Sequence, residues 1–238
     1  STRLAMLNLQ NQLTKAQKEL SSGRLADVGI SLGAQSGRAV SRRRELTHLK
    51  MIIDTNGTAS TRLDSAAATA ENIGELAQNF LSTLIASRST LTGPAIAEGE
   101  AKANLNALMD ALNSAVSGEY LFAGLDVGTK PMSAYYADTT STAKTEVDEA
   151  FFEAFGSTQS DEGNKTTITP DLMEEFLSDD GRFHQSFIDP DDASSLWSNW
   201  STASSQNIRS RIGTSETLET SSNANFSAYR KLAEAYTM

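Results

Sequence analysis

The side chains that could carry out chemistry are few in this chain and stand far apart. Its 238 residues include no Cys and only two His, and neither His48 nor His184 is spaced to share a metal ion with other ligands. The Asp-Pro-Asp-Asp run at 189–192 lacks the Gly and the distal Glu of a calcium-binding loop. No P-loop, dinucleotide-binding or Gly-x-Ser-x-Gly motif occurs. We therefore expect no enzymatic activity, no cofactor, and no catalytic or metal-binding residue.

The densest basic run, Arg42-Arg43-Arg44, could contact phosphate groups. In a protein of net charge −10, however, three basic residues ahead of a neutral helical segment are typical of a solvated face. No apolar stretch approaches the roughly 18 residues that a membrane span needs, and no Sec-type signal is present. Neither nucleic acid nor a membrane is an expected partner.

The elements that would position these residues are long helices. Apolar residues recur in steps of three and four over thirteen positions: Leu49, Ile52, Asn56, Ala59, Leu63, Ala66, Ala70, Ile73, Ala77, Phe80, Leu84, Ser87 and Leu91. A seven-residue repeat keeps its stripe toward a partner only when helices pack side by side, so this seam predicts one long helix with long partners. We expect the helix to begin near 36–40 and to end at Thr92-Gly93-Pro94.

Similar spacing predicts three further helical segments. Residues 1–22 carry Met6, Leu9, Leu13, Ala16 and Leu20, and Ser21-Ser22-Gly23 should end that helix. A helix from about Ala95 to Gly118 should fold back antiparallel on the long helix, because the turn between them is short. Residues 203–238 are predicted to be helical throughout, with Ile208, Ile212, Ser215, Glu219, Ser222, Phe226, Tyr229, Ala233 and Tyr236 on the seam. Both ends of the chain stop within a predicted helix, so we expect the natural chain to continue.

The middle of the chain differs in composition. Residues 126–202 hold 16 Asp and Glu against four Lys and Arg, and ten of the 16 aromatic residues. We therefore predict a mainly α protein: an elongated antiparallel bundle or coiled-coil rod formed by 1–127 and 203–238, and a small inserted α+β domain, rich in β structure, at 128–202. Short strands and one small helix, near Pro170 to Leu177, are expected in the insert.

Several strings resemble the flagellin superfamily, in which the two ends of one chain form a helical bundle and variable outer domains lie between them. They are Gln12 to Gly23, ending in Leu20-Ser21-Ser22-Gly23; Ser36 to Val40; Gly118-Glu119-Tyr120-Leu121-Phe122-Ala123-Gly124; and Asn207 to Gly213, which contains Arg209, Arg211 and Gly213. The string from Gly118 is typical of the hook-filament junction proteins of this superfamily, the hook-associated protein 3 class. The family's usual Ala-Ser-Asp-Asp-Pro-Ala-Gly connector is replaced here by residues 28–37, which leaves the connector contacts open.

This resemblance implies a structural adaptor in the bacterial flagellum. Its partners would be copies of itself in a tubular layer, hook-associated protein 1 on the hook side, flagellin on the filament side, and an export chaperone before secretion. It would be extracellular after export by the flagellar type III pathway. Flagellin itself is the nearest alternative, followed by a coiled-coil signalling module and by a sugar-binding adhesin built around Trp197 and Trp200.

Overall fold

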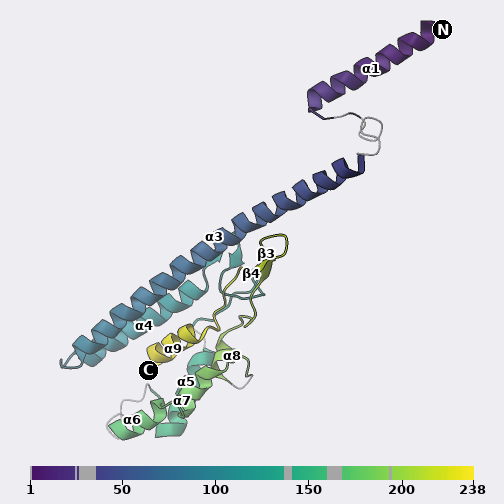
Figure 1. Ribbon diagram of the computed structural model, residues 1–238. Coiled ribbons are helices and arrows are strands. Elements are labelled where there is room, and N and C mark those ends of the chain that lie inside the picture. The colour runs from purple at the N-terminus through teal and green to yellow at the C-terminus, as the bar shows by residue number, and fades with distance from the viewer. Residues whose placement is uncertain (1, 25, 27–35, 137–140, 160–167, 193–194) are drawn as a thin grey trace. The chain divides into compact units, whose positions relative to one another are not determined.

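The computed structural model describes residues 2–24, 26, 36–136, 141–159, 168–192 and 195–238 (Figure 1). The chain divides into two compact units, Ser1–Asp54 and Thr55–Met238. We call them the N-terminal and C-terminal units and describe each by itself. The boundary falls within the long helix α3 (Ser36–Ser87), so both units contain part of that helix.

The N-terminal unit consists of helix α1 (Thr2–Ser22) and the first part of α3. The end of α1 follows the sequence prediction: the Ser22 hydroxyl donates to the Lys18 carbonyl at 2.6 Å, and Gly23 then adopts a φ of +62°, which ends the helix. The predicted start of α3 near 36 is also confirmed. Most of the predicted connector, including residues 27–35, lies outside the described residues.

Helix α3 is 52 residues long, which corresponds to about 78 Å at 1.5 Å per residue. The predicted end at 92–94 is wrong, because α3 stops at Ser87. The turn residues 88–92 follow, and α4 (Gly93–Leu112) begins directly after them. The chain turns here through hydrogen bonds from Thr90 N to Ser87 O and from Gly93 N to Thr90 O. A Cβ on Gly93 would lie 1.9 Å from the Ser87 carbonyl oxygen, so this sharp turn requires glycine. Leu91 is in the turn and fully exposed, not on the seam.

Three helices pack together in the C-terminal unit. Helix α4 folds back along α3, as predicted, and helix α9 (Ser227–Thr237) packs against α4 (Figure 1). The Phe80 and Tyr236 rings meet edge to face, with centroids 5.2 Å apart, and join α9 to α3. The predicted fold class, mainly α with a helical bundle made by both ends of the chain, is confirmed.

The prediction that residues 203–226 are helical is wrong. This segment contains the antiparallel hairpin β3 (Arg209–Arg211) and β4 (Thr217–Glu219). Its Ser, Thr and Asn side chains favour turns over helix interiors, and the polar seam positions Ser215, Glu219 and Ser222 offered no apolar stripe to bury. A second short hairpin, β1 (Ala115–Val116) and β2 (Glu119–Tyr120), follows α4.

In the described residues the named strands lie outside the insert, contrary to the expectation of a β-rich module. The described part of 128–202 forms four helices, α5 (Thr142–Phe155), α6 (Pro170–Leu177), α7 (Arg182–Ile188) and α8 (Leu196–Trp200), and one isolated bridge between Met132 and Ser201. The predicted helix at 170–177 is confirmed, with the Thr169 hydroxyl accepting from Leu172 N. Aromatic packing, not strand pairing, organises this region: Phe151, Phe176, Phe183, Phe187, Trp197 and Trp200 form a chain of ring contacts.

The insert and the helical bundle share one hydrophobic core. The buried cluster includes Phe80 of α3, Leu105 of α4, Phe183 of α7, Trp197 of α8 and Ala233 of α9. These side chains come from segments far apart in the sequence and belong to one continuous buried cluster. The inserted helices are therefore packed onto the bundle and do not form a separate core.

Candidate assembly surface

Helix α1 presents an apolar face that its own unit does not bury. None of its described residues is buried, and Leu9 and Leu20 are 72% and 88% exposed. Met6 and Leu13, on the same side of the helix, are exposed as well. A helix with a 3.6-residue apolar stripe is stable in water only when another surface covers that stripe. The uncovered stripe makes α1 a candidate surface for a partner helix.

The first part of α3 combines exposed apolar and basic side chains. Val40, Leu46, Leu49, Met51 and Ile53 are exposed large apolar residues, whereas Ile52 is buried. The run Arg42-Arg43-Arg44 is exposed on the same stretch. A surface of this kind suits association with another protein chain, because apolar contacts supply affinity and charges supply orientation.

In the C-terminal unit the seam of α3 faces inward over most of its length. Ala59, Ala66, Ile73 and Phe80 are buried, with Ile73 only 3% exposed. Leu63, Ala70 and Ala77 are half-buried, and Leu84 is exposed beyond Phe80. Of the seam residues after 203, Ile208, Ile212 and Tyr229 are half-buried, Phe226 is exposed, and Ala233 and Tyr236 of α9 are buried. The seam thus forms the bundle core between Ala59 and Phe80.

The Gly118 to Gly124 string forms a turn and then a buried strand-like segment. Ser117 and Gly118 have φ values of +55° and +83°, which close the β1–β2 hairpin. Leu121, Phe122, Ala123 and Gly124 are buried. The Arg62 side chain of α3 donates to the Glu119 carboxylate and to the Tyr120 carbonyl oxygen. This string therefore lies against α3 and inside the fold, while only Gly118 and Glu119 are exposed at the turn.

The string from Asn207 to Gly213 forms strand β3 and its entry. Arg209 and Arg211 are exposed, and Gly213 is half-buried at the turn into β4. The Asn56 side-chain amide on α3 donates to the Ile212 carbonyl oxygen at 2.9 Å. The two strings that carry the family resemblance in this unit are thus each hydrogen-bonded to α3, one through Arg62 and the other through Asn56. Leu20, Ser21, Ser22 and Gly23 end α1 and are exposed.

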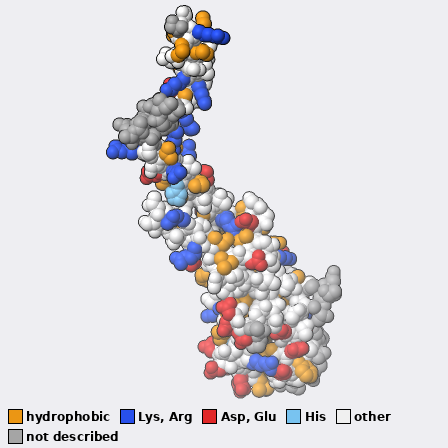
Figure 2. Space-filling view, turned by 90° about the vertical axis from the view of Figure 1, so that its right-hand side faces the viewer, with side chains coloured by type: hydrophobic (Ala, Val, Ile, Leu, Met, Phe, Trp, Pro, Cys, Tyr) orange, Lys and Arg blue, Asp and Glu red, His pale blue; other side chains and the backbone are white. Residues whose placement is uncertain are grey.

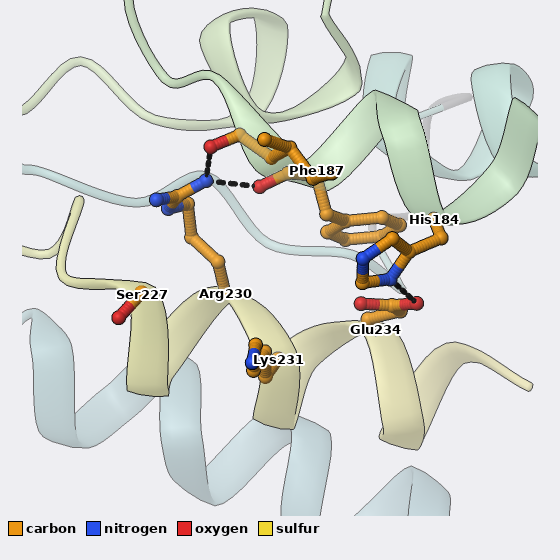
Figure 3. Close-up of a pocket in the computed structure, with 7 residues that line it drawn as sticks. His184, Phe187, Ser227, Arg230, Lys231 and Glu234 are labelled. Carbon is orange, nitrogen blue, oxygen red and sulfur yellow. Dashed lines mark hydrogen bonds and ion pairs between the residues drawn. The ribbon is translucent and has the colours of Figure 1, made fainter. Parts of the chain in front are cut away.

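The sequence patterns missed a polar cluster between α7 and α9 (Figure 3). Arg230 donates to the carbonyl oxygens of Phe187 and Ile188 at the end of α7, and its Nε donates to the Asn225 carbonyl at 3.0 Å. His184 Nδ1 lies 2.8 Å from the Glu234 carboxylate. Burial lowers the pKa of Arg230 from its usual value, and the carboxylates of Asp189 and Asp191 oppose this shift. The i, i+4 spacing of Arg230 and Glu234 places them on one side of a helix and can be read from the sequence. Their partners, Phe187 and His184, lie 40 to 50 residues earlier and cannot be predicted from that spacing.

This cluster borders a pocket of about 260 Å³ whose lining also includes Ser227 and Lys231. Two of its charged groups already have partners, since Arg230 caps α7 and Glu234 pairs with His184. Among the residues that the structure describes, no group of three or more His, Cys, Asp or Glu side chains could hold a metal ion. Arg230 and the His184–Glu234 pair beside this pocket therefore hold the insert against α9.

In the described part of the chain, no helix is both long and apolar enough to cross a membrane. No curated protein and no solved structure matches the chain. The family model of the bacterial flagellin N-terminal helical region matches residues 1–126, which include α1, α3, α4 and the Gly118 to Gly124 turn. The chain therefore belongs to the bacterial flagellin family and is a structural component of the flagellum that self-assembles.

Proposed function

We propose that this chain is the adaptor at the hook-filament junction, of the hook-associated protein 3 class. The string Gly118-Glu119-Tyr120-Leu121-Phe122-Ala123-Gly124 supports this assignment, because it is typical of junction proteins. The short span from 128 to 202, packed on the bundle, is consistent with it. In this role the protein joins hook-associated protein 1 on one side to flagellin on the other, after export by the flagellar type III pathway with a chaperone.

The observation that supports assembly most directly is the uncovered apolar face of α1. Burying a Leu or Met side chain contributes about 1.5–3 kcal/mol. Full burial of the four large apolar residues on this face, Met6, Leu9, Leu13 and Leu20, would thus contribute about 6–12 kcal/mol to a contact between subunits. We infer that copies of this chain pack side by side into a tubular layer through this face. The layer presents similar helical bundles to the subunits above and below it.

We also propose that two parts of the chain have different roles in the assembly. Residues 1–127 and 203–238 would form the assembling part, and the acidic segment 128–202 would be the outer part. The shared core supports a rigid attachment between the two, because Phe183 and Trp197 are buried with Phe80 and Leu105. An insert attached in this way would stay in one orientation on every subunit.

The second candidate function is that of a filament subunit. It is favoured by the family match itself, which is to the flagellin helical region. Immunogold electron microscopy with an antibody against this chain would separate the two functions. Label confined to a band where hook meets filament is the result expected of an adaptor. Label along the whole filament would overturn the adaptor proposal and leave the filament subunit.

A further inference from the structure

The two units carry opposite net charge. The N-terminal unit holds nine Lys and Arg against four Asp and Glu, a net charge of +5. The C-terminal unit holds 11 against 26, a net charge of −15. In an assembly of identical subunits, a basic surface of one copy can meet an acidic surface of the next, and such complementarity sets the register of packing.

The positive charge is concentrated on the first turns of α3. Of Arg38, Arg42, Arg43 and Arg44, only the last two lie on the same side of the helix as Val40 and Thr47. We call Val40, Arg43, Arg44 and Thr47 the basic face. All four arginines are exposed, and within the described residues their guanidinium groups make no ion pair or hydrogen bond. A hollow on the helix is lined by Val40, Arg43, Arg44 and Thr47. Guanidinium groups beside an apolar side chain form a surface that fits carboxylates with an apolar neighbour.

A matching surface lies on α6 and the turn after it. We call Asp171, Glu174, Glu175, Asp179 and Asp180, with Leu172 and Leu177, the acidic face, and all of these residues are exposed. Figure 2 shows Asp and Glu side chains gathered at the end of the C-terminal unit that holds the inserted helices. His184 lies 3.9 Å from Asp179, and Arg182, two residues after Asp180, is paired with Glu153 outside this face.

We propose that the basic face of one subunit docks on the acidic face of a neighbouring copy in the assembled flagellar layer. This inference rests on the proposed self-assembling function and adds the contact that sets the register. Charge complementarity selects a second copy as the occupant. Each chain supplies both faces, which have opposite charge and each include an exposed aliphatic side chain. Single exposed ion pairs contribute little, but several such pairs acting together steer and orient an encounter, and salt weakens them.

Charge reversal tests the contact in flagella isolated from cells. R43E/R44E and D171K/E174K/E175K should each reduce the chain retained in isolated flagella by roughly tenfold, the effect of a few lost pairs. Cells that carry both variants together should recover retention, because the reversed faces match each other. The control R88E/K231E changes the charge by the same amount as the arginine variant at exposed positions outside both faces and should be retained. Equal loss in the control, or no recovery in the mixture, would overturn the contact.

Disulfide trapping gives a direct readout, because the natural chain has no Cys. Cells would carry R43C and E174C on separately tagged copies, and their isolated flagella would be oxidised. We expect a disulfide-linked pair with both tags, and much less of it when E71C, exposed on α3, replaces E174C. Chain present in the flagella without the R43C–E174C link would overturn the contact and leave the proposed function standing. Absence of the natural chain from flagella would overturn the proposed function as well.

Discussion

Asn56 of α3 donates a hydrogen bond of 2.9 Å to the carbonyl oxygen of Ile212, 156 residues further along the chain. Asn56 is one of two polar residues in an otherwise apolar seam, and this bond explains its presence. It fixes the β3–β4 hairpin against the long helix at one position. A polar residue in a seam can set register in this way at some cost in stability, and here the Asn56 Oδ1 atom is buried without a hydrogen-bond partner among the described residues.

Replacing Asn56 by Ala should lower the free energy of unfolding by about 1–2 kcal/mol. The reason is that the Ile212 carbonyl loses its donor in a half-buried site. Thermal unfolding followed by circular dichroism would show a fall in Tm of roughly 2–6 °C for a chain of this size. Asn72→Ala, an equal truncation at an exposed position of the same helix, should leave Tm nearly unchanged. An equal fall in both variants would contradict a specific role of this hydrogen bond, because Ala has a higher helix propensity than Asn and cannot by itself lower Tm.

Gly124 and Gly118 form a matched pair for testing the buried turn. Gly124 has a φ of +69°, and a Cβ there would lie 2.2 Å from the Ser204 carbonyl oxygen and 2.6 Å from that of Gln206. Gly118 has a φ of +83° with nothing within 4 Å of its Cβ position. Gly124→Ala should therefore cost more than about 3 kcal/mol, and Gly118→Ala only about 1 kcal/mol of backbone strain. Denaturant unfolding would measure both, and a smaller loss at Gly124 would contradict the close approach.

Arg230 should be the main polar attachment of the insert to α9. Arg230→Ala removes three donated hydrogen bonds and leaves the carbonyls of Phe187 and Ile188 without this donor. We expect a loss of about 2–3 kcal/mol, since hydrogen bonds from a charged group are the stronger ones. Fluorescence of the buried Trp197 and Trp200 during urea unfolding would report it. Lys231→Ala, at an exposed neighbour, is the control, and similar losses in both variants would contradict this role.

Stability should fall at alkaline pH because burial raises the pKa of Tyr135, Tyr229 and Tyr236 above 10.0. The folded state thus holds these phenols neutral more strongly than the unfolded chain does. The contribution of these tyrosines to the free energy of unfolding is complete below about pH 10. It is lost as the pH rises further, because the phenols of the unfolded chain then ionise first. Tm measured from pH 8 to 11 should be flat and then fall, and Tyr135→Phe should lessen the fall. A decline that the Tyr135→Phe variant shares in full would argue against Tyr135 as a source.

At neutral pH the same Tyr135→Phe variant should be close to the natural chain in stability. The Tyr135 hydroxyl is buried and has no hydrogen-bond partner among the described residues, so its removal leaves no group unpaired. This expectation separates the alkaline effect from simple loss of packing. A large loss at pH 7 would show that the hydroxyl is bonded in solution.

The sequence predicted the long elements well because their seams are apolar over many turns. The seven-residue repeat through Ile73 and Phe80 identified α3, and Ser21-Ser22-Gly23 correctly ended α1. The end of α3 was misplaced because Ser87 and Leu91 continue the spacing, whereas Gly93 sets the turn. Residues 203–226 were misassigned because spacing alone was counted, although Ser215, Glu219 and Ser222 are polar.

The attachment of the insert could not be derived from the sequence. Its aromatic residues are spaced i, i+4 at Phe183 and Phe187 and i, i+3 at Trp197 and Trp200, which suits short helices, but no local pattern shows which helix they pack against. That information is in contacts such as Arg230 to Phe187 and Trp197 to Asn225, which join distant segments. Asn56 stands out in the sequence as a polar residue in an apolar seam. Nothing in the sequence shows that its hydrogen-bond partner is the Ile212 carbonyl.

The adaptor role is tested most directly by electron microscopy of cells that lack this protein, together with an immunoblot for flagellin in the medium. We expect hooks without filaments and flagellin released outside the cell, because flagellin would have no layer on which to assemble. Restoring the natural chain should restore filaments. Intact or merely shortened filaments in the deletion strain would contradict the adaptor role and indicate a filament subunit.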